Sequence, residues 1–204
     1  MGSRTRKHLE MLLSAITEEQ VDLILITGDL YDGRNLKMED FLPLKSVGIP
    51  IYFVEGNHEQ YANSDKIREI LKECGVKTLN NQTALFRELH LIGIADTQDE
   101  SFIKEFLSDN SYNDHYSIFL QHSPVGFDFA ANNKIDLMLS GHTHNGQIFP
   151  FNYLVKLAYR HSYGIYHNSG SKLYVTSGSG TWGPVLRIGS RNELVFIDLS
   201  PEMV

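Results

Sequence analysis

Four short apolar segments, each followed at once by a polar turn, constrain the fold of this chain most. They span residues 21–27, 49–54, 116–120 and 135–139. Short apolar runs bounded by turn residues predict buried strands. The first run is apolar nearly throughout, which is typical of a sheet covered on both faces. Helical patterns at 4–19, 36–47 and 63–74 alternate with these runs, with Asn63 and Ser64 as candidate caps. This alternation predicts an α/β fold of two packed sheets with helices outside.

The rest of the chain becomes richer in strands toward its end. We predict short strands at 76–79, 83–87 and 89–94, helices near 99–108 and 126–133, and strands at 172–177, 184–188 and 193–199. Residues 148–166 are crowded with aromatic side chains and predict loop and helix. A length of 204 residues with 42% hydrophobic and 21% charged residues fits one soluble globular domain, 1–204.

Charge and cysteine content narrow the classes of function. The net charge is −7, and basic residues cluster only at 4–7, which disfavours nucleic acid as a partner and a nuclease as the activity. The single cysteine, Cys74, follows a helical pattern and is interpreted as a packing residue. No run reaches the length of a membrane span, and no signal peptide is visible.

The polar residues at the strand ends are candidates for a metal site. In α/β sheets the carboxyl ends of the strands form the crevice where ligands bind. The candidates are Asp29, Asn57, His122, His142 and His144. Carboxylate, amide and imidazole groups together suit manganese, iron or zinc. Each of these residues alone has a structural interpretation, such as a turn former or a core histidine, but five at matching positions favour a shared site.

The stretch 140–147, Ser-Gly-His-Thr-His-Asn-Gly-Gln, is the densest part of this pattern. Gly141 and Gly146 bracket the two histidines and allow sharp turns on either side. Such a turn can place both imidazoles side by side, whereas an extended strand would point them to opposite faces.

These segments together resemble a known family. GDLYDG, GNHE, QHSP and SGHTHNGQ, in that order, resemble four of the five sequence blocks of the calcineurin-like metallophosphoesterases. The stretch 178–184 with Arg187 is similar to the branch that includes bacterial cell-wall and membrane-associated phosphoesterases. The resemblance implies a four-layer α/β/β/α sandwich and a metal-dependent hydrolase of phosphoric monoesters or diesters.

The resemblance also implies roles for individual residues. Asp29 would bridge two metal ions, Asn57, His122 and His142 would complete the second ion, and His144 would serve the first. His58 would lie near the leaving group, as a general acid or a group that orients substrate, and Asn57 would also contact substrate. Two ions about 3.5–4 Å apart can activate water and stabilise both the attacking and the leaving oxygen. Asp32 is a candidate support for His58 or for a ligand, with a solvated turn carboxylate as the alternative. Glu59 is interpreted as structural or as part of the rim.

One block of the family pattern is not found. The family carries Asp-x-His at the end of its first strand, whereas this sequence opens with Met1-Gly2-Ser3-Arg4 and continues into a helix. His8 is the only nearby histidine, and its helical position predicts a surface residue. We therefore expect an N-terminally truncated domain that lacks the first strand and holds only one ion. The alternative is a catalytically degraded scaffold that binds a protein partner. Localisation stays open between cytoplasmic and membrane-associated, the latter if upstream segments exist.

Weaker patterns remain outside this interpretation. Gly178-x-Gly180-x-x-Gly183 matches a dinucleotide-binding pattern, but Pro184 and a further apolar run replace the required helix. His161 and His167 are interpreted as structural or rim residues. The aromatic stretch 148–166 is interpreted as hydrophobic cover. Its alternative is an apolar lip beside the site that accepts a lipid-linked phosphate or touches a membrane, next to the other substrate option, a phosphorylated small molecule.

Overall fold

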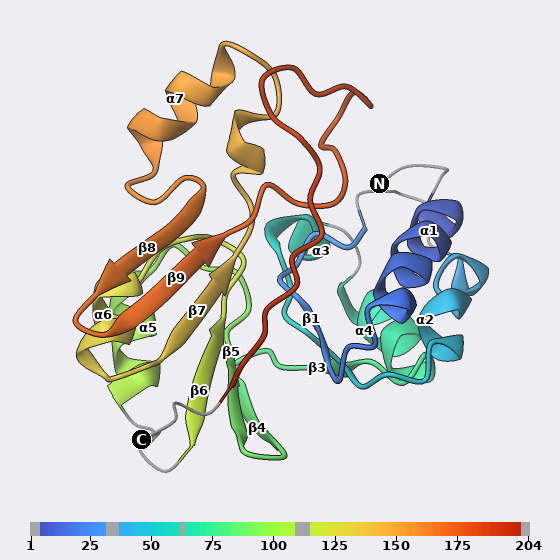
Figure 1. Cartoon of the computed structure of the whole chain (residues 1–204), viewed down its shortest axis with the longest axis horizontal. Coiled ribbons are helices and arrows are strands. Elements are labelled where there is room, and N and C mark those ends of the chain that lie inside the picture. Colours follow the sequence, from blue (N-terminus) through green and yellow to red (C-terminus); the bar gives the residue numbers. More distant parts are fainter. Residues whose placement is uncertain (1–4, 32–36, 62–63, 109–114, 201–204) are drawn as a thin grey trace.

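The computed structural model describes residues 5–31, 37–61, 64–108 and 115–200, and its strands form two sheets (Figure 1). The first sheet has the order β1-β2-β3, and both of its pairings are parallel. The second has the order β4-β5-β6-β7-β9-β8, in which β4 and β8 run antiparallel to their neighbours. The strands are β1 (Ile24–Ile26), β2 (Ile51–Phe53), β3 (Lys77–Thr78), β4 (Gln82–Phe86), β5 (Leu89–Gly93), β6 (Tyr116–Leu120), β7 (Leu137–Ser140), β8 (Gly164–Asn168) and β9 (Ser171–Val175).

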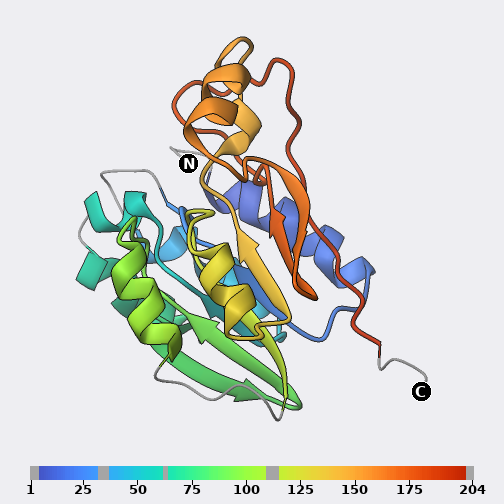
Figure 2. The ribbon, with the colours of Figure 1, turned by 90° about the vertical axis from the view of Figure 1, so that its left-hand side faces the viewer.

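Helices cover the outer faces of both sheets (Figures 1 and 2). The α-helices are α1 (Thr5–Glu18), α2 (Leu42–Ser46), α3 (Asn57–Tyr61), α4 (Ser64–Glu73), α5 (Glu100–Ser108), α6 (Phe127–Asn132) and α7 (Phe151–Ala158), and the 3-10 helices are η1 (Met38–Asp40) and η2 (His144–Gly146). Leu9 and Leu13 of α1 pack with Ile67 and Leu71 of α4 against the first sheet. Ile103 and Phe127, from α5 and α6, pack against the second.

A third apolar cluster joins the two sheets. Tyr52 and Val54 of the first sheet contact Leu91, Ile118 and Leu139 of the second. Burying these side chains contributes about 1.5–3 kcal/mol each, so this layer is a main source of cohesion between the sheets. The predicted α/β architecture of two packed sheets flanked by helices is therefore confirmed.

Several predicted elements differ from the structure. Residues 193–199 form no strand and join no ladder among the described residues, and 184–188 make only an isolated bridge between Ile148 and Ile188. An apolar run becomes a strand only beside a partner strand, and β1, the nearest open edge, is separated from 193–199 by a cavity described below. β8 begins within residues 148–166, for which the sequence predicts loop and helix. The helix predicted over 36–47 is divided into η1 and α2, with Pro43 in the first turn of α2.

Other predictions hold, and two fall on residues that are not described. α4 begins at Ser64, whereas Asn63 lies outside the described residues. Cys74 is buried, and its thiol contacts the carbonyl of Phe41, as expected of a packing residue. Asp32 also lies outside the described residues. β1 departs from the prediction of two covered faces, because Leu25 and Ile26 are only half-buried.

Candidate metal centre

The ends of four strands bring the candidate ligands together. Asp29 follows β1, Asn57 follows β2, and His122 and His142 follow β6 and β7. One ligand atom each from Asp29, His122 and His142 lie within 4.8 Å of one another. The first sheet thus supplies the carboxylate and the second sheet supplies the two imidazoles. The group lies at the junction of the sheets, as expected from the carboxyl ends of the strands.

His122 has the geometry of a metal ligand whose tautomer is fixed from behind. Its Nδ1 lies 2.7 Å from the carbonyl oxygen of Thr27, and a carbonyl can only accept, so Nδ1 carries the hydrogen. In the neutral ring Nε2 is then an unprotonated acceptor. This Nε2 is buried without a hydrogen-bond partner and lies 3.1 Å from Oδ2 of Asp29. With the ring neutral, Nε2 of His122 and Oδ2 of Asp29 both present lone pairs, and two such atoms at this distance can bind one cation. These residues therefore suit the divalent ion that the sequence predicts.

Asn57 and His142 form a second close pair of candidate metal ligands. Oδ1 of Asn57 lies 3.0 Å from Nδ1 of His142. Two ligands that bind one ion at about 2.1 Å each and at right angles are about 3 Å apart. The hydroxyl of Tyr159 contacts Nε2 of His142 at 2.7 Å and holds the ring from the other side. Asn57 therefore extends the three-residue group to four candidate ligands.

The protonation states suit binding of a cation at neutral pH. Burial alone would raise the pKa of Asp29, but the contacts with His122 and the backbone N–H of His58 outweigh it and lower the pKa to about 2. Burial and the proximity of His122 lower the pKa of His142. Burial opposes a charge on His122, whereas Asp29 favours one, and the net effect raises the pKa of His122. Asp29 is thus anionic and the His142 ring neutral, which are the forms that bind metal, whereas a cation must displace any proton that Asp29 holds on Nε2 of His122.

Glu59 fixes the two loops that carry the first-sheet ligands. Its carboxylate is fully buried and accepts backbone N–H groups of Asp29 and Gly56, both at 2.8 Å, and of Tyr31 at 3.1 Å. Gly56 must lack a side chain, because a Cβ there would lie 2.2 Å from Oδ1 of Asp29. Gly28 has φ +89°, and a Cβ there would lie 2.7 Å from Nδ1 of His122. The close approach of these loops is therefore built into the sequence.

His58 lies at the edge of the same group. Its backbone N–H donates to Oδ1 of Asp29 at 3.0 Å, and its Nε2 lies 3.8 Å from Oδ2 of Asp29. The side chain of His58 is 17% exposed, so a ligand in solution can reach it. This position is compatible with the predicted contact with a leaving group.

His144 lies outside the three-residue group. Its Nδ1 faces the guanidinium of Arg187 at 3.3 Å, and Arg187 also donates to the His144 carbonyl at 3.0 Å. Burial and the charge of Arg187 lower the pKa of His144 to about 4, so the ring is neutral at pH 7. His142, His144 and Asn145 all have positive φ values, between 49° and 66°. Left-handed backbone at non-glycine residues costs free energy and is typical of functional loops.

The sequence of the chain matches that of a known protein family. Residues 3–146 match the family described as calcineurin-like phosphoesterase, which is more than half of the chain. The chain belongs to the calcineurin-like phosphoesterase family. The matched region contains every candidate ligand and His58.

Similar proteins of this family occur in bacteria and animals. An uncharacterized metallophosphoesterase of Helicobacter pylori J99 is 33% identical over 213 residues, which cover 99% of this chain and 58% of the relative. An uncharacterized metallophosphoesterase of Campylobacter jejuni is 32% identical, covering 94% of this chain and 54% of the relative. A zebrafish (Danio rerio) protein named "Transmembrane protein with metallophosphoesterase domain" is 31% identical, covering 95% of this chain and 49% of the relative. The chain thus spans about half the length of these relatives.

Several residues that shape this candidate metal site were not predicted to do so. The sequence predicts Glu59 to be structural or part of the rim; it is structural, and its contacts position Asp29 directly. Tyr159 gave no signal beyond an aromatic-rich stretch, and Thr27 acts through its backbone carbonyl, which sequence does not report. Asp96, after β5, accepts from the backbone N–H of Ser123 at 3.1 Å and places negative charge near His122. Thr27 and Tyr159 are not expected from a pattern of metal-binding side chains, whereas Asp96 is a carboxylate after a strand end and carried a signal of the same kind as Asp29.

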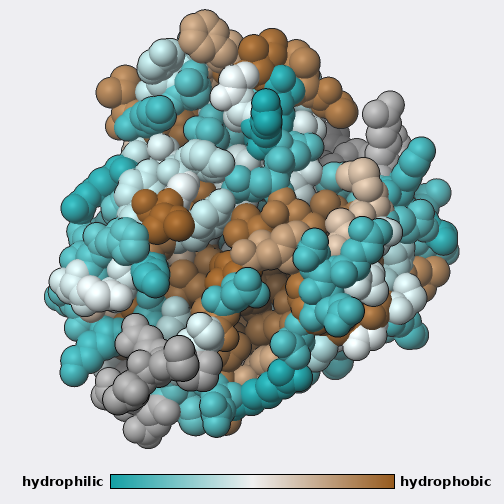
Figure 3. All heavy atoms as spheres, viewed as in Figure 1, coloured by the Kyte–Doolittle hydropathy of each residue, from teal (hydrophilic) through white to brown (hydrophobic). Residues whose placement is uncertain are grey.

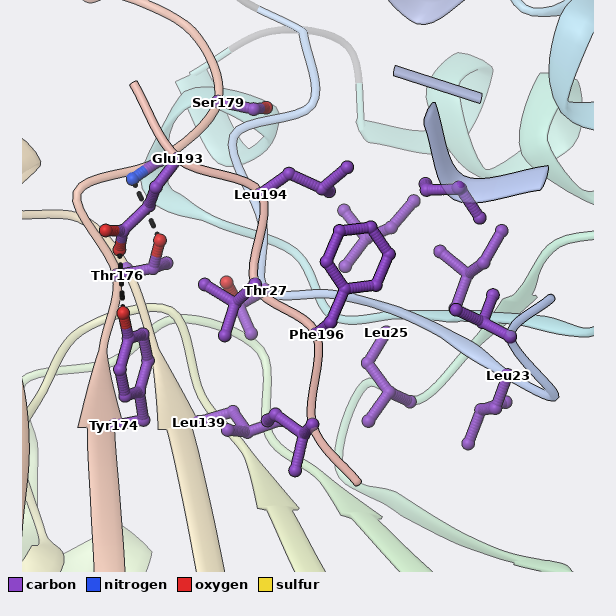
Figure 4. Close-up of a pocket in the computed structure, with 18 of the residues that line it drawn as sticks. Leu23, Leu25, Thr27, Leu139, Tyr174, Thr176, Ser179, Glu193, Leu194 and Phe196 are labelled. Atoms are coloured by element: carbon purple, nitrogen blue, oxygen red, sulfur yellow. Dashed lines mark hydrogen bonds between the residues drawn. The ribbon is translucent and has the colours of Figure 1, made fainter. Parts of the chain in front are cut away.

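An apolar slot opens beside the site. It has a volume of about 970 Å³ and reaches from α1 and β1 to the strands of the second sheet and to residues 193–200 (Figures 3 and 4). Leu23, Leu25 and Leu139 line it together with Leu194 and Phe196 (Figure 4). At its far end the slot reaches the metal-site residues Asp29, His122 and His142.

His8, on α1, is not the surface residue that its helical position predicted. It is half-buried, and its ring contacts the backbone of Ser179. It is not a member of the group formed by Asp29, His122 and His142. His161 packs edge-on against Phe127 and Tyr166, in keeping with its structural interpretation. Within the described part of the chain no helix follows Gly183, as expected for a pattern unrelated to dinucleotide binding.

Proposed function

We propose that this chain is a metal-dependent hydrolase of phosphoric esters with at least one divalent ion held by Asp29, Asn57, His122 and His142. The observation that carries the proposal is the convergence of the buried Nε2 of His122, 3.1 Å from Oδ2 of Asp29, with a ring nitrogen of His142 in one group of candidate ligands. Family membership supports the choice of a phosphoric ester as substrate.

Each residue of the site has a separate role in the proposed hydrolysis. When bound, a divalent ion supplies Lewis acidity for the phosphoryl oxygens and lowers the pKa of water. Asp29 supplies the one negative charge among the four ligands, so the site keeps a net positive charge that attracts an anionic ester. Asn57 positions an amide beside the ion, and the exposed edge of His58 is placed to donate a proton or hydrogen bond to the leaving oxygen. Glu59 keeps Asp29 and the Gly56 loop in register.

Metal content and turnover together test this proposal. We expect the purified chain to bind Mn²⁺ or Zn²⁺ by calorimetry and mass spectrometry, and to hydrolyse p-nitrophenyl phosphate or bis-p-nitrophenyl phosphate with added Mn²⁺. Asp29→Asn should weaken metal affinity at least 100-fold, because it removes the only anionic ligand. Asp22→Asn is a matched control at an exposed carboxylate paired with Arg87. Metal binding without turnover of either ester would favour the non-catalytic scaffold, and the absence of metal binding would refute the proposed hydrolase.

We also propose that the apolar slot accommodates one additional β-strand, as the resemblance to the family implies. β1 pairs only with β2, so its other edge has no ladder partner in the described structure. Residues 193–199 run along the opposite side of the slot without joining a ladder. A strand parallel to β1 would bury Leu23 and Leu25 and end beside Asp29. Its backbone could form hydrogen bonds with the open edge of β1 on one side and with residues 193–199 on the other. Its last residues could then supply further ligands for a second ion.

Hydrogen exchange tests the strand. In the chain 1–204 we expect the amides of Leu23 and Leu25 that face the slot to exchange quickly, and an apolar peptide of alternating Val and Leu to protect them and raise the melting temperature. A serine-threonine peptide of equal length is the control. Protection by both peptides, or by neither, would contradict the proposal.

A further inference from the structure

Apolar side chains gather at one end of the molecule, on residues 149–157, which include most of α7, and on residues 182–188. We call this surface the apolar tip. Its members are Phe149, Phe151, Tyr153, Leu154, Leu157, Trp182, Val185, Leu186 and Ile188. Each is between 49% and 84% exposed, and the tip projects at the top of Figures 1 to 3. Single exposed apolar residues are normal on soluble proteins, but a contiguous group of nine marks a contact surface.

The two segments of the tip form one unit. The backbone N–H of Phe149 donates to the carbonyl of Ile188 at 2.8 Å, and the N–H of Ile188 donates to the carbonyl of Gln147 at 2.9 Å. The buried side chain of Gln147 accepts from the backbone N–H of Trp182 at 2.6 Å and donates to its carbonyl at 2.7 Å. The apolar side chains are therefore presented together by a hydrogen-bonded base.

α7 itself has an unusual environment for a helix of this composition. Its sequence, FNYLVKLA, is apolar around most of its circumference, yet none of its residues is buried. A surface helix of a soluble protein buries one apolar stripe and keeps a polar face, whereas an apolar circumference is typical of helices surrounded by protein core or by lipid. Asn152 and Lys156 are the polar members of α7.

The charge of this region differs in sign from that of the whole chain. Residues 137–192 contain no acidic residue, although the net charge of the chain is −7. Of their five basic residues, Arg160 pairs with Asp128, Lys172 lies away from the tip, and Lys156, Arg187 and Arg191 lie in or near it. Lys156 lies within the tip and is exposed, and Arg191 is exposed just beyond it. An apolar projection bearing basic residues and no acidic ones complements an anionic lipid surface.

We infer that the apolar tip inserts into the surface of an anionic lipid bilayer. The insertion is interfacial, and among the described helices none is long and apolar enough to cross a membrane. Tyr159, the residue after α7, contacts His142, so docking by the tip brings the candidate metal centre close to the lipid surface. The docking does not depend on the proposed hydrolase activity.

Vesicle flotation tests the inference with the chain 1–204 and two kinds of vesicle, pure phosphatidylcholine and phosphatidylcholine mixed with phosphatidylglycerol. We expect flotation with the anionic vesicles. Phe151→Ser combined with Leu157→Ser should weaken binding at least about tenfold, because it removes two inserting side chains. Lys156→Glu should weaken binding to anionic vesicles about five- to twentyfold and leave the weak binding to neutral vesicles unchanged.

Matched controls lie away from the tip. Leu85→Ser changes an equally exposed apolar residue on β4, and Lys172→Glu reverses a charge at the start of β9, at the end of that strand remote from the site. Both should bind vesicles as the parent chain does. Thermal melts of every variant separate loss of binding from loss of folding, and hydrolysis of a soluble aryl phosphate reports separately on the proposed activity. Equal flotation of the tip variants and the parent would overturn the inference. Failure of the parent chain to float with anionic vesicles would also overturn it. In that case, a dimer in light scattering that becomes monomeric in the double serine variant would assign the tip to contact with a second copy of the chain.

Discussion

Glu59 offers a direct way to test how the metal centre is held. Its buried carboxylate accepts three backbone N–H groups, two at Oε2 and one at Oε1. Glu59→Gln keeps the shape but replaces one oxygen with an amide NH₂. If the remaining oxygen faces Asp29 and Gly56, the new NH₂ faces the N–H of Tyr31. Both groups are donors, so the N–H of Tyr31 loses its acceptor.

The expected cost follows from this count. One buried donor left without an acceptor costs about 1–3 kcal/mol, and removing a charged acceptor weakens the other two hydrogen bonds. Burial and the nearby charge of Asp29 raise the pKa of Glu59, so losing its charge also relieves some repulsion. We expect Glu59→Gln to lower the free energy of unfolding by about 2 kcal/mol, and Glu59→Ala, which strands all three donors, by about 4 kcal/mol. Because the loop that holds Asp29 shifts, metal affinity should fall about 10- to 100-fold in Glu59→Gln.

Urea unfolding and calorimetric titration with Mn²⁺ measure the two effects. Glu55→Gln is the matched control, because Glu55 is also a buried glutamate but pairs with Arg68 at 2.9 Å instead of with the ligand loops. We expect the control to lose stability and to keep its metal affinity. Equal loss of affinity in both variants would show that general destabilisation, and not the Glu59 hydrogen bonds, governs the site. An unchanged unfolding free energy in Glu59→Gln would refute the clamp itself.

Two further predictions concern the same region. Gly56→Ala should weaken metal affinity at least tenfold in a calorimetric titration, because the added Cβ would lie 2.2 Å from Oδ1 of Asp29. Gly48→Ala, where a Cβ meets nothing within 4 Å but φ is +71°, should lower stability and leave affinity unchanged. Arg187→Lys should lower the melting temperature by several degrees, because a lysine cannot reproduce the several hydrogen bonds that the guanidinium makes, among them one to the carbonyl of His144; no change would show that these bonds are dispensable.

The convergence of the ligands could be predicted from sequence because it follows from strand direction. β1 and β2 run parallel in one sheet, and β6 and β7 run parallel in the other, so their carboxyl ends present Asp29, Asn57, His122 and His142 at one junction. The apolar runs showed where the strands end, and the polar residue types showed what the ends could bind. Both signals are local, which is why they survive without knowledge of the tertiary structure.

The remaining features depend on partners that no local pattern reports. Residues 193–199 are as apolar as many strands, but a strand needs a neighbour at hydrogen-bonding distance, and the slot separates this segment from β1. Glu59 looks like any acidic residue in a short helix, and its role arises from N–H groups up to thirty positions away. The direction in which His144 faces depends on Arg187, which lies far along the chain. Sequence therefore predicts the position of a site better than the orientation of its side chains.

The placement of the ligands on different sheets has a consequence for stability. Asp29 and Asn57 follow strands of the first sheet, and His122 and His142 follow strands of the second, whereas no ladder joins the sheets in the described structure. The hydrogen bond from Nδ1 of His122 to the Thr27 carbonyl is a direct polar link across this junction. A bound ion would add bonds from both sides at the same point, so its binding free energy would act as cohesion between the sheets. Saturating Mn²⁺ should therefore protect β1 and β7 from hydrogen exchange together, whereas an ion bound within one sheet alone would protect only the strands of that sheet.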